Sequence, residues 1–140
     1  MANEAILLVK LEPAIPTTVS NGTGIEKGSL MNLADLNTGA LSATAAEELS
    51  GIAVSEKIAS DGKAALGVIK RGVFKMYCSG AVNVGRAVQS AADANYPNHI
   101  EEAGVTSSGS SILGHALETG ATTEQIMVMV DVGAGGNQVS

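Results

Sequence analysis

Apolar and polar residues alternate most clearly in two stretches of the chain, residues 73–78 and 124–132. In the first stretch, Phe74, Met76 and Cys78 share one face, and in the second the shared face is formed by the β-branched residues of 126–132. Side chains of a β-strand point alternately to two faces, so each stretch predicts a strand with one apolar face toward a core. Glycines at 67, 72, 80 and 85 cut the surrounding chain into short strands and turns, which indicates a compact hairpin system.

Shorter apolar runs predict further strands at residues 51–56 and 111–118, followed by turns at 59–62 and 119–123. Residues 44–49 fit two interpretations equally, a single helical turn capped by Thr44 or a polar loop. Residues 89–109, rich in Ala, Asn, Ser and Gly, predict a long surface loop. The chain is therefore expected to be mostly β, a small β-barrel or sandwich with short strands.

The N-terminal segment, residues 1–21, is predicted to be an extended arm. Its apolar run suits a strand, while Pro13 and Pro16 exclude a helix or a central strand. Such a strand can pair with its own sheet or with a neighbouring chain. Deleting residues 2–16 is expected to leave the remaining β-domain, residues 22–132, folded, and residues 133–140 are expected to form a flexible tail. The candidate partner-binding residues are the apolar side chains of the arm, Ile6, Leu7, Leu8, Val9 and Leu11.

Two parts of the chain resemble each other. Residues 25–31 match residues 82–88 at an offset of 57, and residues 51–55 match residues 114–118 at an offset of 63. Both copies end in an apolar strand that runs toward a glycine. This pattern predicts an internal duplication, with two similar β-units closing into one barrel or sandwich that hides its sheet edges.

Composition narrows the classes of partner. Only three of 140 residues are aromatic, so Ala, Val, Leu, Ile and Met must fill a thin core, which association with other chains would complete. The net charge of −6 argues against nucleic-acid binding, although Lys70, Arg71, Lys75 and Arg86 lie close in sequence. We interpret those four as solvated strand ends. A single cysteine excludes an intramolecular disulfide. We expect no signal peptide and no membrane-spanning run, and therefore synthesis in the cytoplasm.

The residues that could carry chemistry do not form a recognisable motif. A nucleophilic Cys78 would need His99 or His115 as its base, but Cys78 is expected to face the core and His99 to lie in a loop. His99 with Glu101 and Glu102, or His115 with Glu118, lacks the usual spacing of metal ligands. Residues 133–136 are glycine-rich without a following Lys-Ser or Lys-Thr, unlike a phosphate loop. We expect no enzymatic activity, no cofactor and no metal.

Several short motifs occur in a characteristic order, at residues 51–54, 67–76, 81–88 and 112–118, followed by a final strand at 126–132. In this order they resemble the small capsid decoration (cement, or head-stabilising) proteins of tailed viruses such as bacteriophages, most closely a group defined by one domain of unknown function. The likeness covers about residues 22–132. It does not cover the proline-containing arm, and the 89–109 segment is particular to this chain.

The resemblance implies a non-enzymatic viral structural protein that binds the outer surface of a capsid built from HK97-type major capsid protein. Such proteins commonly form homotrimers that clamp neighbouring capsomers, so the expected partners are the major capsid protein and further copies of this chain. The expected location is the outer capsid surface of the virion. An alternative from the residues alone is a free-standing β-barrel module that binds a small ligand or carbohydrate, for which Tyr77 and Tyr96 are the available aromatic platform.

Overall fold

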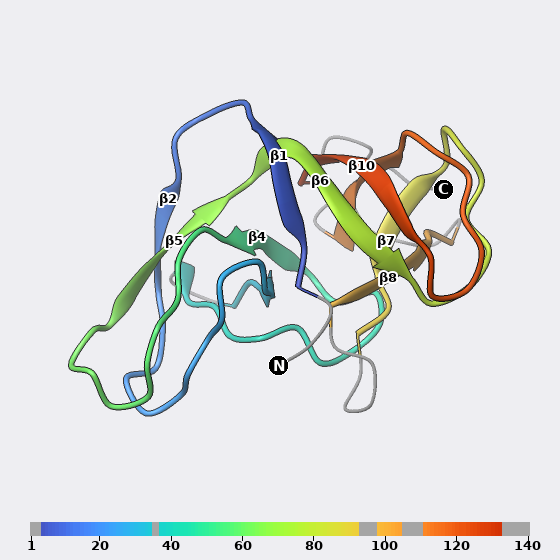
Figure 1. Cartoon of the computed structure of the whole chain (residues 1–140). Helices are drawn as coiled ribbons and strands as arrows, with labels where there is room; N and C mark the ends of the chain where they lie inside the picture. The colour runs from blue at the N-terminus through green and yellow to red at the C-terminus, as the bar shows by residue number, and fades with distance from the viewer. Residues whose placement is uncertain (1–3, 35–36, 93–97, 105–110, 133–140) are drawn as a thin grey trace.

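The structure, a computed structural model, describes residues 4–34, 37–92, 98–104 and 111–132. These residues form ten β-strands in two sheets and no α-helix (Figure 1). The mostly-β fold expected from the sequence is confirmed. No helix in the described part of the chain is long and apolar enough to cross a membrane.

The larger sheet has six strands in the order β1-β6-β10-β9-β7-β8. Their bounds are β1 Ile6–Lys10, β6 Arg71–Cys78, β7 Ala87–Ser90, β8 His99–Glu102, β9 Ile112–Ala116 and β10 Gln125–Asp131. The last strand, β8, also pairs in parallel with β6, with Tyr77 opposite His99. Five strands therefore close into a ring, and β1 lies outside it, antiparallel to β6.

The smaller sheet has four strands in the order β2-β5-β4-β3. Their bounds are β2 Ile15–Thr18, β3 Leu30–Asn32, β4 Leu49–Ala53 and β5 Ala65–Ile69. All neighbouring strands in it are antiparallel. In Figure 1 this sheet lies on the left, and the chain crosses from β5 into β6 to enter the larger sheet.

The alternation in the sequence identifies the inward faces of the long strands correctly. Phe74, Met76 and Cys78 of β6 are at most 2% exposed, and so are Ile126, Val128 and Val130 of β10. The residues between them are half-buried. The larger core cluster contains these side chains together with Leu30, Leu49, Ile52 and Ile69 from the smaller sheet, so one core joins the two sheets.

The N-terminal segment is part of both sheets. Its first strand, β1, pairs with β6, and β2 pairs with β5, so the segment pairs with its own chain, which is one of the two arrangements expected for it. Pro16 lies in β2, where the side-chain amide of Asn37 donates to its carbonyl oxygen at 2.8 Å. Deletion of residues 2–16 would remove β1, the buried Ala5 and the first half of β2, so the two sheets would each lose pairing at one edge; that the remaining β-domain stays folded is still a prediction.

The sequence-based assignment of residues 89–109 to a surface loop is wrong. The predicted loop at 89–109 contains the end of β7 and the whole of β8, and His99 on β8 is only 3% exposed. Residues 44–49 form a turn followed by the start of β4. In that turn Glu47 Oε1 accepts hydrogen bonds from the backbone N–H groups of Ala43 and Thr44, so the polar-loop interpretation holds. The predicted tail, 133–140, lies outside the described residues.

The internal duplication is present in the strand pairing. The order β2-β5-β4-β3 in residues 15–69 (repeat 1) recurs as β6-β10-β9-β7 in residues 71–132 (repeat 2). Leu30 pairs with Ile52 in repeat 1, and Ala87 pairs with His115 in repeat 2. Leu30 and Ala87 are 57 residues apart, and Ile52 and His115 are 63 residues apart, which are the offsets found in the sequence. Both strand pairings also have an irregularity, which follows the residue after Leu30 in repeat 1 and the residue after Ala87 in repeat 2.

The turns of the two repeats share the same backbone conformation and hydrogen bonds. Gly28 and Gly85 have φ angles of 88° and 85°, a region that favours glycine. The N–H of Gly28 donates to Ala53 O at 2.9 Å, and that of Gly85 donates to Ala116 O at 2.8 Å. The likeness between the repeats therefore extends from the strand order to single hydrogen bonds.

Candidate functional site

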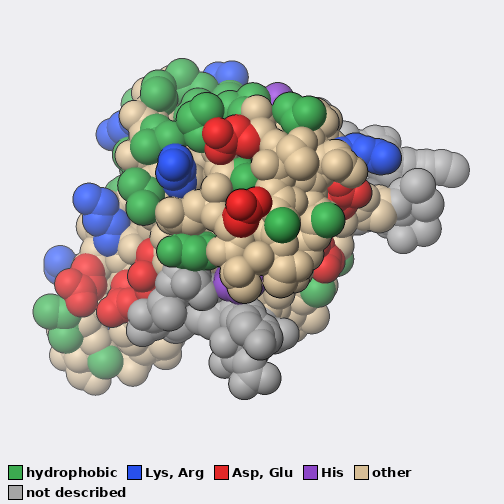
Figure 2. All heavy atoms as spheres, turned by 45° about the vertical axis from the view of Figure 1, so that its right-hand side comes forward, with side chains coloured by type: hydrophobic (Ala, Val, Ile, Leu, Met, Phe, Trp, Pro, Cys, Tyr) green, Lys and Arg blue, Asp and Glu red, His purple; other side chains and the backbone are tan. Residues whose placement is uncertain are grey.

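The residues proposed from sequence as partner contacts form an exposed apolar patch on β1 and on Leu11, which directly follows it. Ile6, Leu7, Leu8, Val9 and Leu11, here called the β1 patch, are 38–51% exposed. A cluster of exposed large apolar residues on a folded domain is typical of an interaction surface. Figure 2 shows hydrophobic and basic side chains side by side across the upper part of one face of the molecule.

The exposure of this patch follows from the position of β1 in the sheet. One edge of β1 pairs with β6, and no described strand pairs with the other edge. Ile6 lies opposite Lys75 and Val9 opposite Val73, whose side chains are half-buried on the outer face of the sheet. The outer edge of β2 instead contains Pro16, which has no N–H to offer another strand, and Thr18, whose carbonyl already accepts from the N–H of Gly39 at 2.8 Å. Of these two edges, only β1 presents an apolar strand without a proline.

An open hollow of about 550 Å³ lies beside the β1 patch. Its lining combines apolar and polar side chains, namely Glu4, Ile6, Leu7, Lys27, Tyr77 and Gln125. The ring of Tyr77 stacks on that of His99, with 6.1 Å between centroids and 13° between planes. The hollow therefore has one aromatic wall, held in place by a buried histidine.

The geometry of β6 and β8 does not bring Cys78 and His99 together as a catalytic pair. His99 lies opposite Tyr77, whereas Cys78 is the next residue and its side chain points to the other face. Burial, and to a lesser extent the nearby Glu124, raises the pKa of the Cys78 thiol. Such a thiol is a poor nucleophile at neutral pH. His115, the other candidate base, is exposed on β9.

The carboxylates considered as metal ligands are engaged elsewhere. Glu101 accepts a hydrogen bond from Gln89 Nε2 at 2.6 Å, and Glu102 accepts one from the N–H of Asn83 at 2.8 Å. Glu118 accepts from the N–H of Met127 at 2.7 Å. Across the residues with described positions, no group of three or more His, Cys, Asp or Glu could hold a metal ion. Residues 133–136 lie outside that part of the chain.

The basic residues at 70–86 do not all behave as solvated strand ends. Lys70 donates from Nζ to the carbonyl of Ser50 at 2.7 Å, and burial lowers the pKa of its ammonium group. Arg71 forms an ion pair with Asp131 on the neighbouring strand β10, with 3.4 Å between Nε and Oδ1. Two of the four therefore have defined partners that connect strands.

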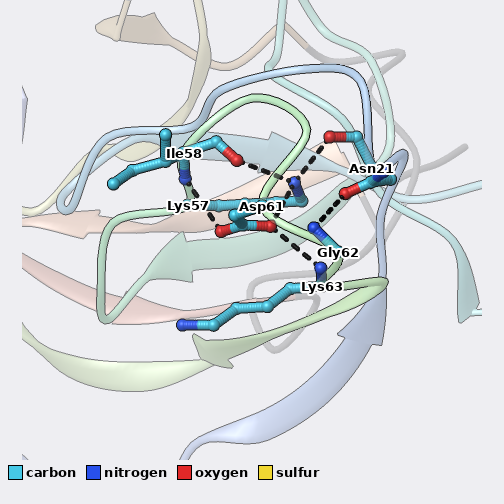
Figure 3. Close-up of polar contacts among 6 residues, drawn as sticks. All are labelled: Asn21, Lys57, Ile58, Asp61, Gly62 and Lys63. Atoms are coloured by element: carbon cyan, nitrogen blue, oxygen red, sulfur yellow. Dashed lines mark hydrogen bonds and ion pairs between the residues drawn. The ribbon is translucent and has the colours of Figure 1, made fainter.

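Sequence analysis missed a buried lysine in repeat 1 (Figure 3). The side chain of Lys57 is fully buried, and its Nζ donates to Asn21 O at 2.8 Å, to Ile58 O at 3.2 Å and to Asp61 Oδ1 at 3.1 Å. Asp61 in turn accepts from the N–H groups of Lys63 and Ile58, at 2.9 and 3.2 Å. The N–H of Lys63, more than Lys57, holds the pKa of Asp61 below its ordinary value. The cluster joins the loop before β3 to the loop between β4 and β5. In the sequence, the turn predicted at 59–62 was the only feature that pointed to it.

No protein-family model and no curated protein matches this chain.

Proposed function

We propose that this protein is a viral capsid decoration protein. It binds the outer surface of an HK97-type capsid and stabilises the shell by bridging neighbouring capsomers. It does so as a homotrimer, without catalysis or a cofactor, and its partner is the major capsid protein. The motif order described above supports this proposal, and the β1 patch is the observation that carries it.

The β1 patch suits docking on another protein because it is already ordered. Its strand is held by β6 on one edge and by the hydrogen bond from Ala5 N–H to Gly28 O at 2.8 Å. A preformed strand loses less conformational entropy on binding than a free arm. Fully burying a large, exposed aliphatic side chain contributes about 1.5–3 kcal/mol. Because the side chains of the patch are 38–51% exposed, each gains only part of that value, and several of them together are needed for a stable contact.

Co-sedimentation with empty shells of the virus, before and after shell expansion, tests the proposal. Wild-type protein is expected to bind expanded shells saturably. The double variant Ile6→Thr/Val9→Thr keeps β-forming residues but removes apolar surface, and its binding is expected to weaken at least tenfold. The matched control is Ile58→Thr, because Ile58 is 64% exposed on a turn remote in sequence from β1. Absence of wild-type binding refutes the decoration function, and unchanged binding of the double variant refutes the role of β1.

The hollow beside Tyr77 favours a second candidate function, a module that binds a small ligand or carbohydrate. A volume of about 550 Å³ is within the usual range for ligand sites, and an aromatic wall suits a sugar ring. This function predicts a monomer in sedimentation equilibrium, and ligand-induced shifts of the Tyr77 ring signals. The decoration function predicts a mass of three chains in the same measurement.

A further inference from the structure

The two repeats share one backbone but differ in what covers it. In repeat 1, Gly28, Ser29 and Leu30 are buried. At the corresponding positions of repeat 2, Gly85 and Arg86 are exposed and Ala87 is only half-buried. Since the hydrogen bonds of the two turns correspond, the difference in exposure comes from the surroundings of each turn.

The chain's own N-terminal segment covers the turn in repeat 1. The N–H of Ala5 donates to Gly28 O at 2.8 Å, and a Cβ added to Gly28 would overlap the carbonyl oxygen of Ala5. Ala5 and Leu7 also line a small cavity of about 30 Å³ together with Val54 and Ile69. Lys27, Gly28, Val54 and Ile69, here called the Gly28 face, thus receive an extended apolar segment.

The corresponding residues of repeat 2 are uncovered. They are Val84, Gly85, Leu117 and Met129, here called the Gly85 face. Val84 is 60% exposed, Leu117 is 37% exposed and Met129 is half-buried. A Cβ added to Gly85 would meet no atom within 4 Å. The Gly85 face therefore has the backbone of the Gly28 face and a more apolar turn, because Val84 replaces Lys27.

We propose that the Gly85 face is a docking site for an extended apolar segment of a partner protein. A backbone N–H of that segment donates to Gly85 O, as Ala5 donates to Gly28 O. Its next inward-facing side chain, two residues later, packs on Leu117 and Met129, as Leu7 packs beside Val54 and Ile69. The partner's segment thus has a small residue followed at the second position by a branched apolar residue.

The number of such segments in the chain favours a partner as the occupant. Each copy of the chain has two equivalent faces but one N-terminal segment, and the Gly28 face already holds it. A second copy uses its own N-terminal segment in the same way, so that segment is not available to a neighbouring copy. The site is separate from the β1 patch and does not depend on the capsid proposal.

A synthetic peptide with the sequence of residues 2–11 is a suitable probe, because this sequence fits the equivalent face of repeat 1. Titrated into full-length ¹⁵N-labelled protein, it is expected to shift the amide signals of Gly85, Arg86 and Leu117. The Leu117→Glu variant places a charge on the site and is expected to weaken binding at least tenfold. Ile58→Glu, at another exposed apolar residue, is the control and is expected to bind as wild type.

Three outcomes overturn the proposal. One is absence of shifts at millimolar peptide. Another is unchanged affinity in the Leu117→Glu variant. The last is a set of shifts confined to the Gly28 face, which would mean that the peptide only replaces the chain's own segment. Because the assay contains no capsid, failure of the decoration function leaves its result unchanged.

Discussion

At the scale of single residues, two glycines allow neighbouring strands to approach closely. Gly51 and Gly114 occupy the same position in the two repeats, and each lies at an irregularity of its strand pairing. A Cβ at Gly51 would overlap the carbonyl oxygen of Ile69, and one at Gly114 would overlap that of Met129. Backbone atoms cannot move aside as a flexible side chain can, so both positions require glycine.

Gly114→Ala is expected to destabilise the protein by about 3 kcal/mol or more, because the new methyl group forces β9 and β10 apart. Chemical denaturation followed by circular dichroism measures the free energy of unfolding. Gly80→Ala is the control, since a Cβ at Gly80 meets nothing within 4 Å, and its effect is expected within about 1 kcal/mol of zero. Equal stability of the two variants would contradict the close approach at Gly114.

Sequence predicted apolar positions on the long strands far better than buried polar ones. Phe74, Met76 and Cys78 were placed inward correctly because alternation is a local property of the chain. The burial of Lys57 depends on Asn21, which is 36 residues away and contributes a backbone oxygen that no side-chain pattern reveals. Partners of that kind become visible only when the loops are placed together.

At the scale of elements, the Lys57 cluster holds together the loop before β3 and the loop between β4 and β5. Besides the three bonds of Lys57, the side-chain oxygen of Asn21 accepts from the N–H of Gly62 at 2.7 Å. The repeat 2 counterpart of Lys57 is Gly120, which pairs with Val82 through two backbone hydrogen bonds of 2.9 Å. Repeat 1 thus adds a charged clamp to a pairing that repeat 2 makes with backbone alone.

Lys57→Met is expected to lower the free energy of unfolding by about 2 kcal/mol, because it removes the three hydrogen bonds of the buried ammonium group, including its ion pair with Asp61. Lys63→Met is the matched control, since the Lys63 side chain is exposed and only its N–H takes part. Thermal unfolding measures the loss of stability of each variant relative to wild type. A similar loss in both would mean that the buried ammonium contributes nothing specific.

The same clamp predicts a dependence on pH. The pKa of Asp61 in the folded protein lies below its ordinary value near 3.8, so the ionised carboxylate stabilises the fold above that value. This stabilisation is lost as the pH falls through the lower pKa of the folded state. Thermal unfolding from pH 2 to pH 7 is expected to show Asp61→Asn less stable than wild type at neutral pH, with the difference closing in acid. A difference in stability between Asp61→Asn and wild type that stays constant from pH 2 to pH 7 would contradict the role of the ionised carboxylate.

Elements differ in how far the sequence reveals them. The duplication was visible at the offsets 57 and 63 because turn glycines and strand apolar residues recur locally. Strand β8 was missed because its sequence, His-Ile-Glu-Glu, lacks a clean alternation, and its parallel pairing with β6 is made by ring closure. The role of the N-terminal segment depends likewise on distant partners, β6 for β1 and β5 for β2.

At the scale of the whole molecule, the two repeats share one core while presenting different surfaces. Ile52 and Ile69 of repeat 1 are buried in the larger core cluster, whereas their counterparts His115 and Met129 in repeat 2 are exposed or half-buried. The sequence alone identified the β1 patch as the candidate contact. It did not reveal the Gly85 face, because exposure there is recognised only by comparison with the covered face of repeat 1.

The shared core predicts that the repeats unfold together. Ile52→Ala removes side-chain volume where repeat 1 meets repeat 2 and is expected to cost about 2–5 kcal/mol. Two probes follow the repeats in urea, the methyl signal of Met31, buried in repeat 1, and the thiol reactivity of Cys78, buried in repeat 2. Both midpoints are expected to coincide in wild type and to fall by the same amount in the variant, because unfolding either repeat exposes the core of both. Loss of the Met31 signal while Cys78 stays protected would show that repeat 2 folds independently and that the common core does not couple the two.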